Sequence, residues 1–296
     1  MDSKRPSSLA LGAALAAVLL IWSVNYIAGK IALQYIDGLT LAVFRSEIVA
    51  AILVAIYLTR RDRMPLRRRD IWRFVYLGFF GYAVNQCGFV IGLGYTTSDH
   101  SAVIIAAGPI VILLLASTMR LERLTVAKIV GMAICFVGVV VLETENGSPA
   151  HSPFLLGDFI SLVGVIGFSI YTVLGKKVAR AYDSVSMNTF NATAAAIMVL
   201  PIAIRQGIHF QWKAVPWQGW AGLLYMAALS AVAGYLLFYW LLRHMEASRV
   251  VAINYFQPVI VVLISIPLLG ERPTKHLVVS TVLVLLGVFL AERPSG

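Results

Sequence analysis

The chain has 296 residues, of which 59% are hydrophobic and only 13% are charged, and its formal net charge is +10. Soluble domains are about 45–50% apolar and about 25% charged, so this composition excludes a soluble globular domain, a disordered chain and a disulfide scaffold. The strands of a membrane β-barrel would alternate polar and apolar residues, whereas the apolar runs here are continuous. The composition therefore predicts an all-α membrane protein that crosses the bilayer several times.

The apolar runs, taken in chain order, predict ten transmembrane helices, because about 20 apolar residues cross a bilayer. The first run follows Lys4 and Arg5 and resembles a signal peptide, but it is long enough to span and no clean cleavage site follows it. We therefore expect it to be retained as the first helix. The expected helices cover residues 8–30, 38–59, 73–95, 98–119, 125–142, 154–175, 184–204, 217–242, 247–269 and 275–291.

The positive residues predict the orientation of these helices, because Lys and Arg concentrate in cytoplasmic loops. With the N-terminus in the cytoplasm, Arg45 falls inside the second helix and 18 of the 24 Lys and Arg residues fall on the cytoplasmic side. We therefore expect both termini in the cytoplasm of a multi-pass protein of the cell membrane, the inner membrane if the protein is bacterial. The five basic residues left on the outer side are Lys30, Arg205, Lys213, Arg272 and Lys275.

The basic run at 60–73 needs an interpretation of its own, since a net charge of +10 could indicate nucleic-acid binding. This run lacks the interleaved aromatic residues on which bases stack. We interpret it as a topology determinant that also meets anionic lipid headgroups. The expected partners are the bilayer and a small-molecule solute, with no nucleic acid, and the protein is expected to be a monomer or a homodimer.

The two halves of the chain resemble each other. A shift of 149 residues brings Pro109 onto Pro258, and a shift of 146 residues aligns the beginnings of the halves. Residues 1–150 and 151–296 each hold five expected helices, and an odd number inverts the second half relative to the first. Two inverted five-helix repeats around a central cavity are typical of secondary transporters. Other coincident pairs are Glu122 with Glu271, Gly138 with Gly287, Gly29 with Gly175 and Lys30 with Lys176.

Polar and aromatic residues share one face on several expected helices. In lipid such residues usually face the bundle interior or a water-filled path, so we expect a cavity whose aromatic rings stack on a small organic solute or make cation–π contacts with it. Hydrogen bonding between helices without any ligand is the alternative for each residue. The candidate substrate-binding residues are Trp22, Asn25, Tyr82, Asn85, Gln86, Tyr171, Tyr235, Tyr239, Asn254 and Gln257.

Four more residues are candidates for movement or coupling. Pro109 and Pro258 leave the carbonyl four residues earlier without its usual donor, so they are candidate hinges, with a static kink as the alternative. Glu47 is the deepest carboxylate and a candidate for proton coupling, with a packing role as the alternative. Arg45 lies only two positions away, so it points in a different direction; it could snorkel or pair with another helix, and it is a second coupling candidate.

Motifs in both halves are those of one transporter family. They are Trp22-Ser23-Val24-Asn25, Phe44-Arg45, the stretch at 93–98, Pro109 and Glu122-Arg123 in the first half, and Ala247-Ser248, Pro258 and Gly270-Glu271-Arg272-Pro273 in the second. With these motifs the chain resembles the EamA type of the drug/metabolite transporter superfamily. The resemblance implies ten helices, cytoplasmic termini and a cavity built from helices 1, 3, 4, 6, 8 and 9.

One pair of positions departs from that family's pattern. Gly108 and Gln257 precede the two prolines, where the family often has Glu before the first proline. The departure puts proton coupling in doubt.

The function predicted from these features is export of amino acids or related small metabolites by alternating access. The alternatives are another cargo class (a drug, a lipid or a nucleotide-sugar) or a membrane-embedded enzyme. The five histidines do not cluster in the sequence, and no metal-binding, nucleophile-elbow or phosphate-binding motif is present. We therefore expect neither catalytic residues nor a metal nor a cofactor.

Overall fold

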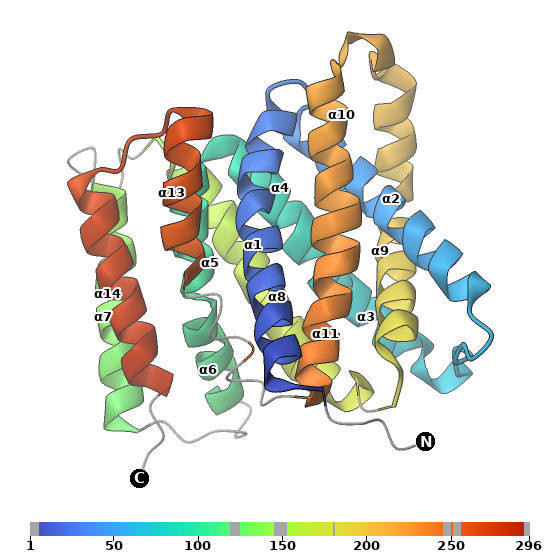
Figure 1. Cartoon of the computed structure of the whole chain (residues 1–296), viewed down its shortest axis with the longest axis horizontal. Coiled ribbons are helices and arrows are strands. Elements are labelled where there is room, and N and C mark those ends of the chain that lie inside the picture. Colours follow the sequence, from blue (N-terminus) through green and yellow to red (C-terminus); the bar gives the residue numbers. More distant parts are fainter. Residues whose placement is uncertain are drawn as a thin grey trace.

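The computed structural model describes residues 6–118, 125–144, 153–179, 181–244, 250 and 256–292, and these are helical apart from short connections (Figure 1). The helices are α1 (Ser8–Leu33), α2 (Gly38–Thr59), α3 (Ile71–Gly78), α4 (Asn85–Tyr95), α5 (Ser98–Ala106), α6 (Gly108–Thr118), α7 (Val126–Glu143), α8 (Leu155–Ala179), α9 (Ser184–His209), α10 (Trp217–Leu224), α11 (Tyr235–His244), α13 (Gln257–Leu269) and α14 (Lys275–Glu292). Two π-helical segments, Phe79–Val84 and Tyr225–Gly234, join α3 to α4 and α10 to α11.

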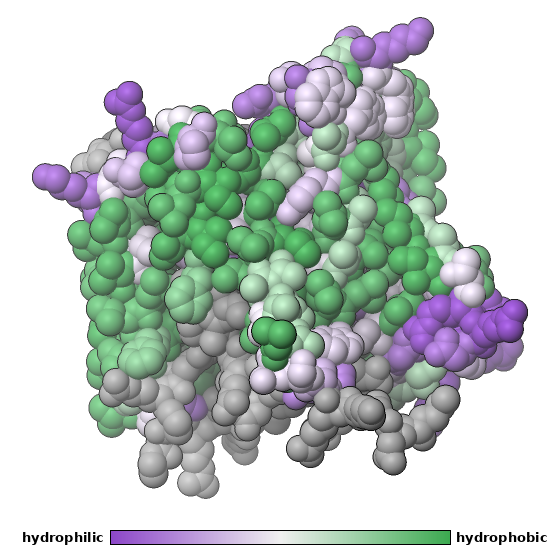
Figure 2. Space-filling model, viewed as in Figure 1, coloured by the Kyte–Doolittle hydropathy of each residue, from purple (hydrophilic) through white to green (hydrophobic). Residues whose placement is uncertain are grey.

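Most of these helices coincide with the expected spans. Seven helices in the described part of the chain are long and apolar enough to cross a membrane, and the shorter apolar helices are Val126–Leu142, Gln257–Leu269 and Lys275–Ala291. Figure 2 shows the matching surface, a broad apolar area with hydrophilic residues gathered toward its edges. The protein is therefore an all-helical, multi-pass membrane protein, as expected.

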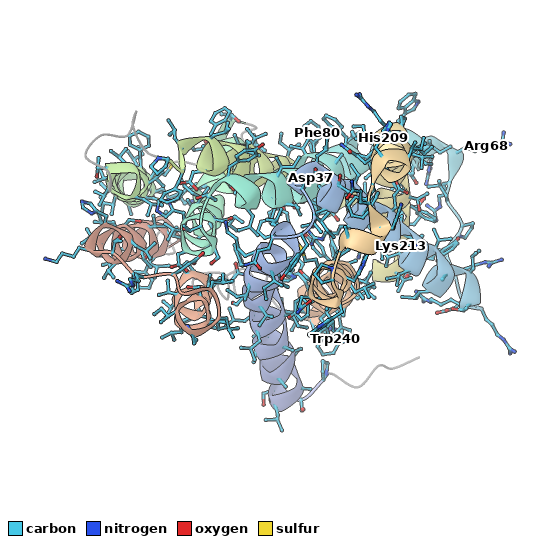
Figure 3. The ribbon with its side chains drawn as sticks, turned by 90° about the horizontal axis from the view of Figure 1, so that it is seen from above. Asp37, Arg68, Phe80, His209, Lys213 and Trp240 are labelled. Carbon is cyan, nitrogen blue, oxygen red and sulfur yellow. The ribbon has the colours of Figure 1, made fainter. Side chains whose placement is uncertain are left out.

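The helices lie side by side, with α7 and α14 paired at one edge and α2 and α9 at the other, and with α1 between them (Figure 1). The beginning of α1 and the end of α14 lie on one side of the bundle, here called the terminal side; the opposite side is called the far side. The basic run at 60–73 follows α2 on the terminal side. Seen from above, Arg68 projects from the edge of the bundle (Figure 3), and its side chain is exposed.

Polar side chains fix several helix starts by accepting hydrogen bonds from the unpaired backbone amides of the first turn. Asp37 accepts from the Thr40 amide at the start of α2, and Thr97 accepts from the His100 amide at the start of α5. Gly270 ends α13 in a left-handed conformation with φ of +69°, which a residue without a Cβ adopts most easily. These residues determine where helices begin and end at the short connections on the far side.

Glycines allow the closest helix contacts. A Cβ built on Gly131 of α7 would lie 2.4 Å from the Gly287 carbonyl oxygen of α14. The expected fifth and tenth helices therefore pack on each other as α7 and α14, and each exposes apolar residues on its other face. In α4, Gly88 lies against Gly164 and Gly92 against Gly157 of α8. Small residues at such contacts let helix backbones approach closely.

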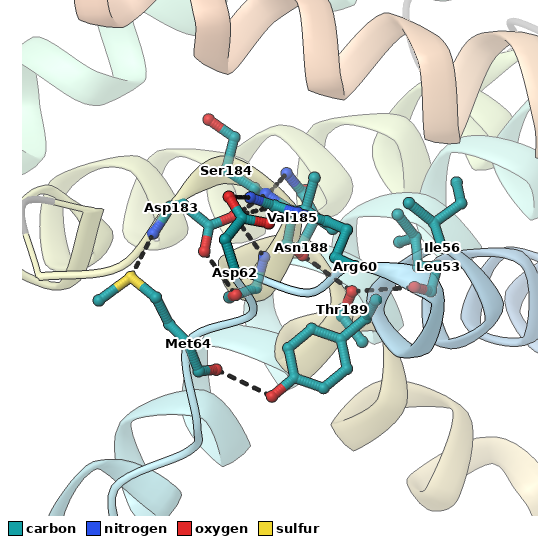
Figure 4. Close-up of polar contacts among 12 residues, drawn as sticks. Leu53, Ile56, Arg60, Asp62, Met64, Asp183, Ser184, Val185, Asn188 and Thr189 are labelled. Carbon is teal, nitrogen blue, oxygen red and sulfur yellow. Dashed lines mark hydrogen bonds and ion pairs between the residues drawn. The ribbon is translucent and has the colours of Figure 1, made fainter. Parts of the chain in front are cut away.

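An ion pair ties the terminal-side end of α2 to the beginning of α9 (Figure 4). Arg60 Nη1 donates to Asp183 Oδ1 over 2.6 Å, and the same oxygen accepts from the backbone amides of Val185 and Ser186. Burial alone would raise the pKa of the Asp183 carboxyl, but hydrogen bonds from Ser186 and Arg60 outweigh it and hold that pKa below its usual 3.8. The carboxylate is thus both a helix cap and an ion-pair partner.

We expect Asp183→Asn to lower the free energy of unfolding by about 1–2 kcal/mol at neutral pH, because a helix cap and a partly buried ion pair weaken together. A carboxyl whose pKa is depressed by folding contributes stability above its unfolded pKa and loses it as the pH falls through its folded pKa. Thermal unfolding should therefore show a constant difference between variant and wild type down to about pH 5, and a shrinking one below about pH 4. Asp62→Asn, at the other, exposed partner of Arg60, is the control and should change little. A difference that grows on acidification would contradict this assignment.

Candidate solute cavity

A cavity of about 110 Å³ lies between the helices, which is room for several water molecules or for a small organic solute. Its wall combines residues from both halves of the chain. The described residues that line it are Trp22, Asn25, Tyr26, Arg45, Asn85, Gln86, Phe89, Ile105, Gly108, Pro109, Ile112, Ser161, Gly164, Val165, Phe168, Ser230, Tyr235 and Gln257.

The π-helical segment at Tyr225–Gly234 positions two of these side chains through its backbone. Arg45 Nε donates to the Met226 carbonyl over 3.2 Å, and Trp22 Nε1 donates to the Ser230 carbonyl over 3.3 Å. A π-helical turn disturbs the regular pairing of main-chain groups and is often found at functional sites. Here its carbonyls accept from side chains of α1 and α2, so the irregular turn holds the cavity wall together.

The amides and rings of the wall hold one another in place. Gln86 Nε2 donates to the Tyr235 hydroxyl over 2.6 Å, and Asn85 Nδ2 donates to the Gly164 carbonyl over 3.0 Å. The Trp22 ring lies 5.5 Å from the Tyr235 ring, centroid to centroid, a spacing typical of attractive aromatic pairs. The wall therefore offers oriented polar groups beside aromatic rings.

Three of the candidate substrate-binding tyrosines lie beside this cavity and are not among its lining residues. The Tyr82 hydroxyl donates to Asn188 Oδ1 over 2.8 Å, and the hydroxyls of Tyr171 and Tyr239 bond to each other. Asn191 Nδ2 donates to the Tyr171 hydroxyl. These side chains hydrogen-bond between helices, which is the alternative considered for each of them.

The remaining candidates are distributed as follows. Pro109 lines the cavity directly after the break between α5 and α6, and Pro258 is buried as the second residue of α13. Glu47 is half-buried on α2 outside the cavity wall, and its Oε1 has no hydrogen-bond partner among the described residues. Asn254 lies outside the described residues.

A polar cluster on the far side of the cavity was not predicted from the sequence. The Asp158 carboxylate accepts from Thr96 Oγ1 over 2.7 Å and lies 2.9 Å from His100 Nδ1, and all three side chains are buried. Lys30 Nζ donates to the Thr96 carbonyl, which ties α1 to the same place. The sequence does contain a signal for this cluster, namely charged residues in the first turns of apolar helices, such as Asp158 in α8.

The cluster extends to α13 and to the connection after it. Glu271 accepts from the Ser98 amide over 3.1 Å and from Ser98 Oγ over 2.5 Å. Ser265 Oγ donates to Asp99 Oδ1 over 2.8 Å. These contacts, with those of Asp158, join the first half of the chain to the second. They are called the far-side cluster below, with Lys30, Thr96, Ser98, Asp99, His100, Asp158, Ser265 and Glu271 as its members.

Along α8 the cavity lies between two polar contacts. Asp158 of the far-side cluster comes first, the lining residues Ser161–Phe168 follow, and Tyr171, bonded to Tyr239 of α11, comes one turn later.

The fold and this site define a class of protein: a polytopic membrane protein with a solute-sized, polar and aromatic cavity inside its helical bundle.

The comparison with protein families identifies that class more narrowly. The model of the EamA-like transporter family matches residues 9–144 and again residues 155–293, so the chain belongs to this family and is a membrane transporter. The resemblance seen in the sequence motifs is thereby confirmed.

Individual relatives agree with this assignment. An uncharacterized transporter of Archaeoglobus fulgidus is 26% identical over 94% of this chain and 97% of its own length. A protein of Salmonella typhimurium named "Probable amino-acid metabolite efflux pump" is 22% identical over 92% of this chain and 91% of its own length. A crystal structure covering 98% of this chain and 99% of the other superposes with a TM-score of 0.65 at 19% identity; this likeness shows the fold.

Proposed function

We propose that this transporter is a secondary exporter of amino acids or related small metabolites, which it carries from the cytoplasm across the cell membrane by alternating access. The observation that carries the proposal is the cavity, which both halves of the chain line with amides, aromatic rings and one cation. The name of the Salmonella relative supports the cargo class and the direction. The basic run at 60–73, which follows α2 on the terminal side, supports cytoplasmic termini.

The mechanism we propose uses ten helices arranged as two inverted five-helix repeats, 1–150 and 151–296. The family model matches once in each half. The two π-helical segments fall at corresponding places, and Pro109 and Pro258 are each the second residue of a helix, α6 and α13. Related halves can exchange conformations, which turns an opening on one side into an opening on the other.

Two sets of contacts would then alternate as barriers. The far-side cluster lies beyond the cavity on one side, while the Tyr171–Tyr239 contact lies toward the terminal side. Pro109 and Pro258 would serve as hinges for the exchange, because a proline at the start of a helix has no amide hydrogen with which to join that helix to the segment before it. In this scheme the far-side contacts break whenever the protein opens outward.

We expect alanine at Trp22, Asn25 or Gln86 to slow solute efflux about tenfold or more, since a lost contact of about 1.4 kcal/mol changes affinity tenfold. The measurement is efflux of a labelled amino-acid mixture from proteoliposomes. Val130→Ala, on the exposed face of α7, is the control and should transport like the wild type. Equal losses in the control and the cavity variants would contradict the role of the cavity, and absence of any efflux by the wild type would contradict the proposed cargo.

A further inference from the structure

Arg45 is a buried cation in the cavity wall. Arg45 is only 3% exposed, and it belongs to α2, a helix long and apolar enough to cross a membrane. The Nε–H is held by the Met226 carbonyl, which lies 181 positions away in the sequence, and the guanidinium carbon lies 6.0 Å from the centroid of the Phe89 ring. The side chain therefore does not snorkel to the membrane surface; it is fixed inside the protein.

This cation has no carboxylate beside it in the described structure. Arg45 is the only charged residue among those that line the cavity, and the ion pairs found between described residues involve Arg60, Arg73 and His100. Nη1 of Arg45 is buried and has no hydrogen-bond partner among the described residues. A buried charge without a partner of opposite sign is strongly unfavourable. An anion that binds from outside the chain would supply that partner.

We infer that Arg45 binds a carboxylate group of the transported solute. A guanidinium offers a planar fork of donors that matches the two oxygens of a carboxylate. Because Met226 holds Nε, the terminal nitrogens are the donors left to a ligand. The single positive charge of the wall balances one carboxylate and leaves a phosphate dianion only half neutralised. The inference rests on the proposed function and limits the transported solutes to those that carry a carboxylate.

A second unpaired atom extends the match toward an amino acid. Oδ1 of Asn25 is a buried acceptor with no partner among the described residues, and Asn25 lines the same cavity on α1. An ammonium group is a donor with a positive charge, and it also favours the faces of aromatic rings such as Trp22 and Tyr235. A solute with one carboxylate and one ammonium would therefore satisfy both the cation and the acceptor of this wall.

The test compares acids with their amides in one experiment. Proteoliposomes are loaded with an equimolar mixture of amino acids, the corresponding amino-acid amides, and uncharged nucleosides and sugars, and efflux is followed by mass spectrometry after subtraction of protein-free liposomes. We expect the wild type to release amino acids about tenfold or more faster than their amides, since the amide lacks the charge of a charge-assisted hydrogen bond.

Variants of Arg45 test whether this residue causes the preference for amino acids over their amides. Arg45→Gln should lose the acid-over-amide preference and slow amino-acid efflux about tenfold or more, and Arg45→Lys should keep part of it. Arg205→Gln, which removes an exposed cation from α9, is the matched control and should behave like the wild type. If Arg45→Gln does not elute as a folded protein, the acid-over-amide ratio of the wild type and of Arg45→Lys still decides.

The possible outcomes distinguish a failure of the carboxylate assignment from a failure of the proposed function. Equal release of acids and amides by the wild type, or unchanged acid efflux in folded Arg45→Gln, would overturn the carboxylate assignment and leave the transporter intact. Release of nucleosides or sugars without amino acids would overturn the assignment and the proposed cargo. Failure to release any component would overturn the proposed function, and the inference would fall with it.

Discussion

Leucine at Gly287 is expected to prevent α7 and α14 from packing and to lower the yield of folded protein sharply. A Cβ at this position would lie 2.5 Å from the Gly131 carbonyl oxygen and 2.6 Å from the Cys135 amide nitrogen. Both atoms belong to the backbone of α7, so neither can rotate away, and the two helices must separate. Overpacking a well-packed core costs about 1–3 kcal/mol and occasionally more. We expect the upper end here, measured as a drop in Tm and in monodisperse protein after purification.

Gly12→Leu is the matched control for this substitution. It makes the same chemical change in another apolar helix, α1, where a Cβ on Gly12 meets no atom within 4 Å. The control should therefore purify and unfold like the wild type. If Gly287→Leu proved as stable as Gly12→Leu, the close contact between α7 and α14 would be wrong.

Asparagine at Asp158 is expected to open the far side of the cavity. The substitution removes the charge of the group that accepts from Thr96 Oγ1 and lies against His100 Nδ1, and a hydrogen bond to a charged group is worth about 1.5–3 kcal/mol. A change of this size shifts a two-state equilibrium by a factor of about 10 to 100. If the far side is the barrier of the transport cycle, the population open to that side should rise strongly.

The measurement is labelling of a cysteine introduced at Ile105, a cavity-lining residue, with Cys87 and Cys135 replaced by alanine. A membrane-impermeant thiol reagent added from the far side should react about tenfold or more faster in Asp158→Asn. Asp62→Asn, an exposed carboxylate on the terminal side, is the control. An unchanged labelling rate in a folded Asp158→Asn variant would remove the far-side cluster from the proposed cycle.

The helices themselves could be predicted because the membrane requires long apolar runs and little else. The expected span at 38–59 has the same bounds as α2, and the expected start of α9 at 184 is also observed. What the apolar pattern does not encode is the local winding of a helix. The π-helical segment at Tyr225–Gly234, for example, presents its carbonyls to Trp22 and Arg45, which belong to other helices.

The site was predictable only in part, for a related reason. Helical spacing shows that residues share a face, but it does not show whether that face meets a cavity or another polar side chain. Trp22 and Gln86 line the cavity, whereas Tyr171 and Tyr239 satisfy each other. For Arg45 the sequence left open whether the side chain snorkels or pairs with another helix. A backbone carbonyl far along the chain decides between the two, and no local pattern reveals such a partner.

The carbonyls of Met226 and Ser230 make part of the cavity frame independent of side-chain identity. Every amino acid has the same carbonyl, so Arg45 and Trp22 would keep their anchors if the residues at 226 and 230 were exchanged for others of suitable size. Deleting a single residue from Tyr225–Gly234 would instead move both acceptors at once. Substitutions in the cavity wall can therefore change which solute it binds, whereas the length of the segment Tyr225–Gly234 must stay fixed.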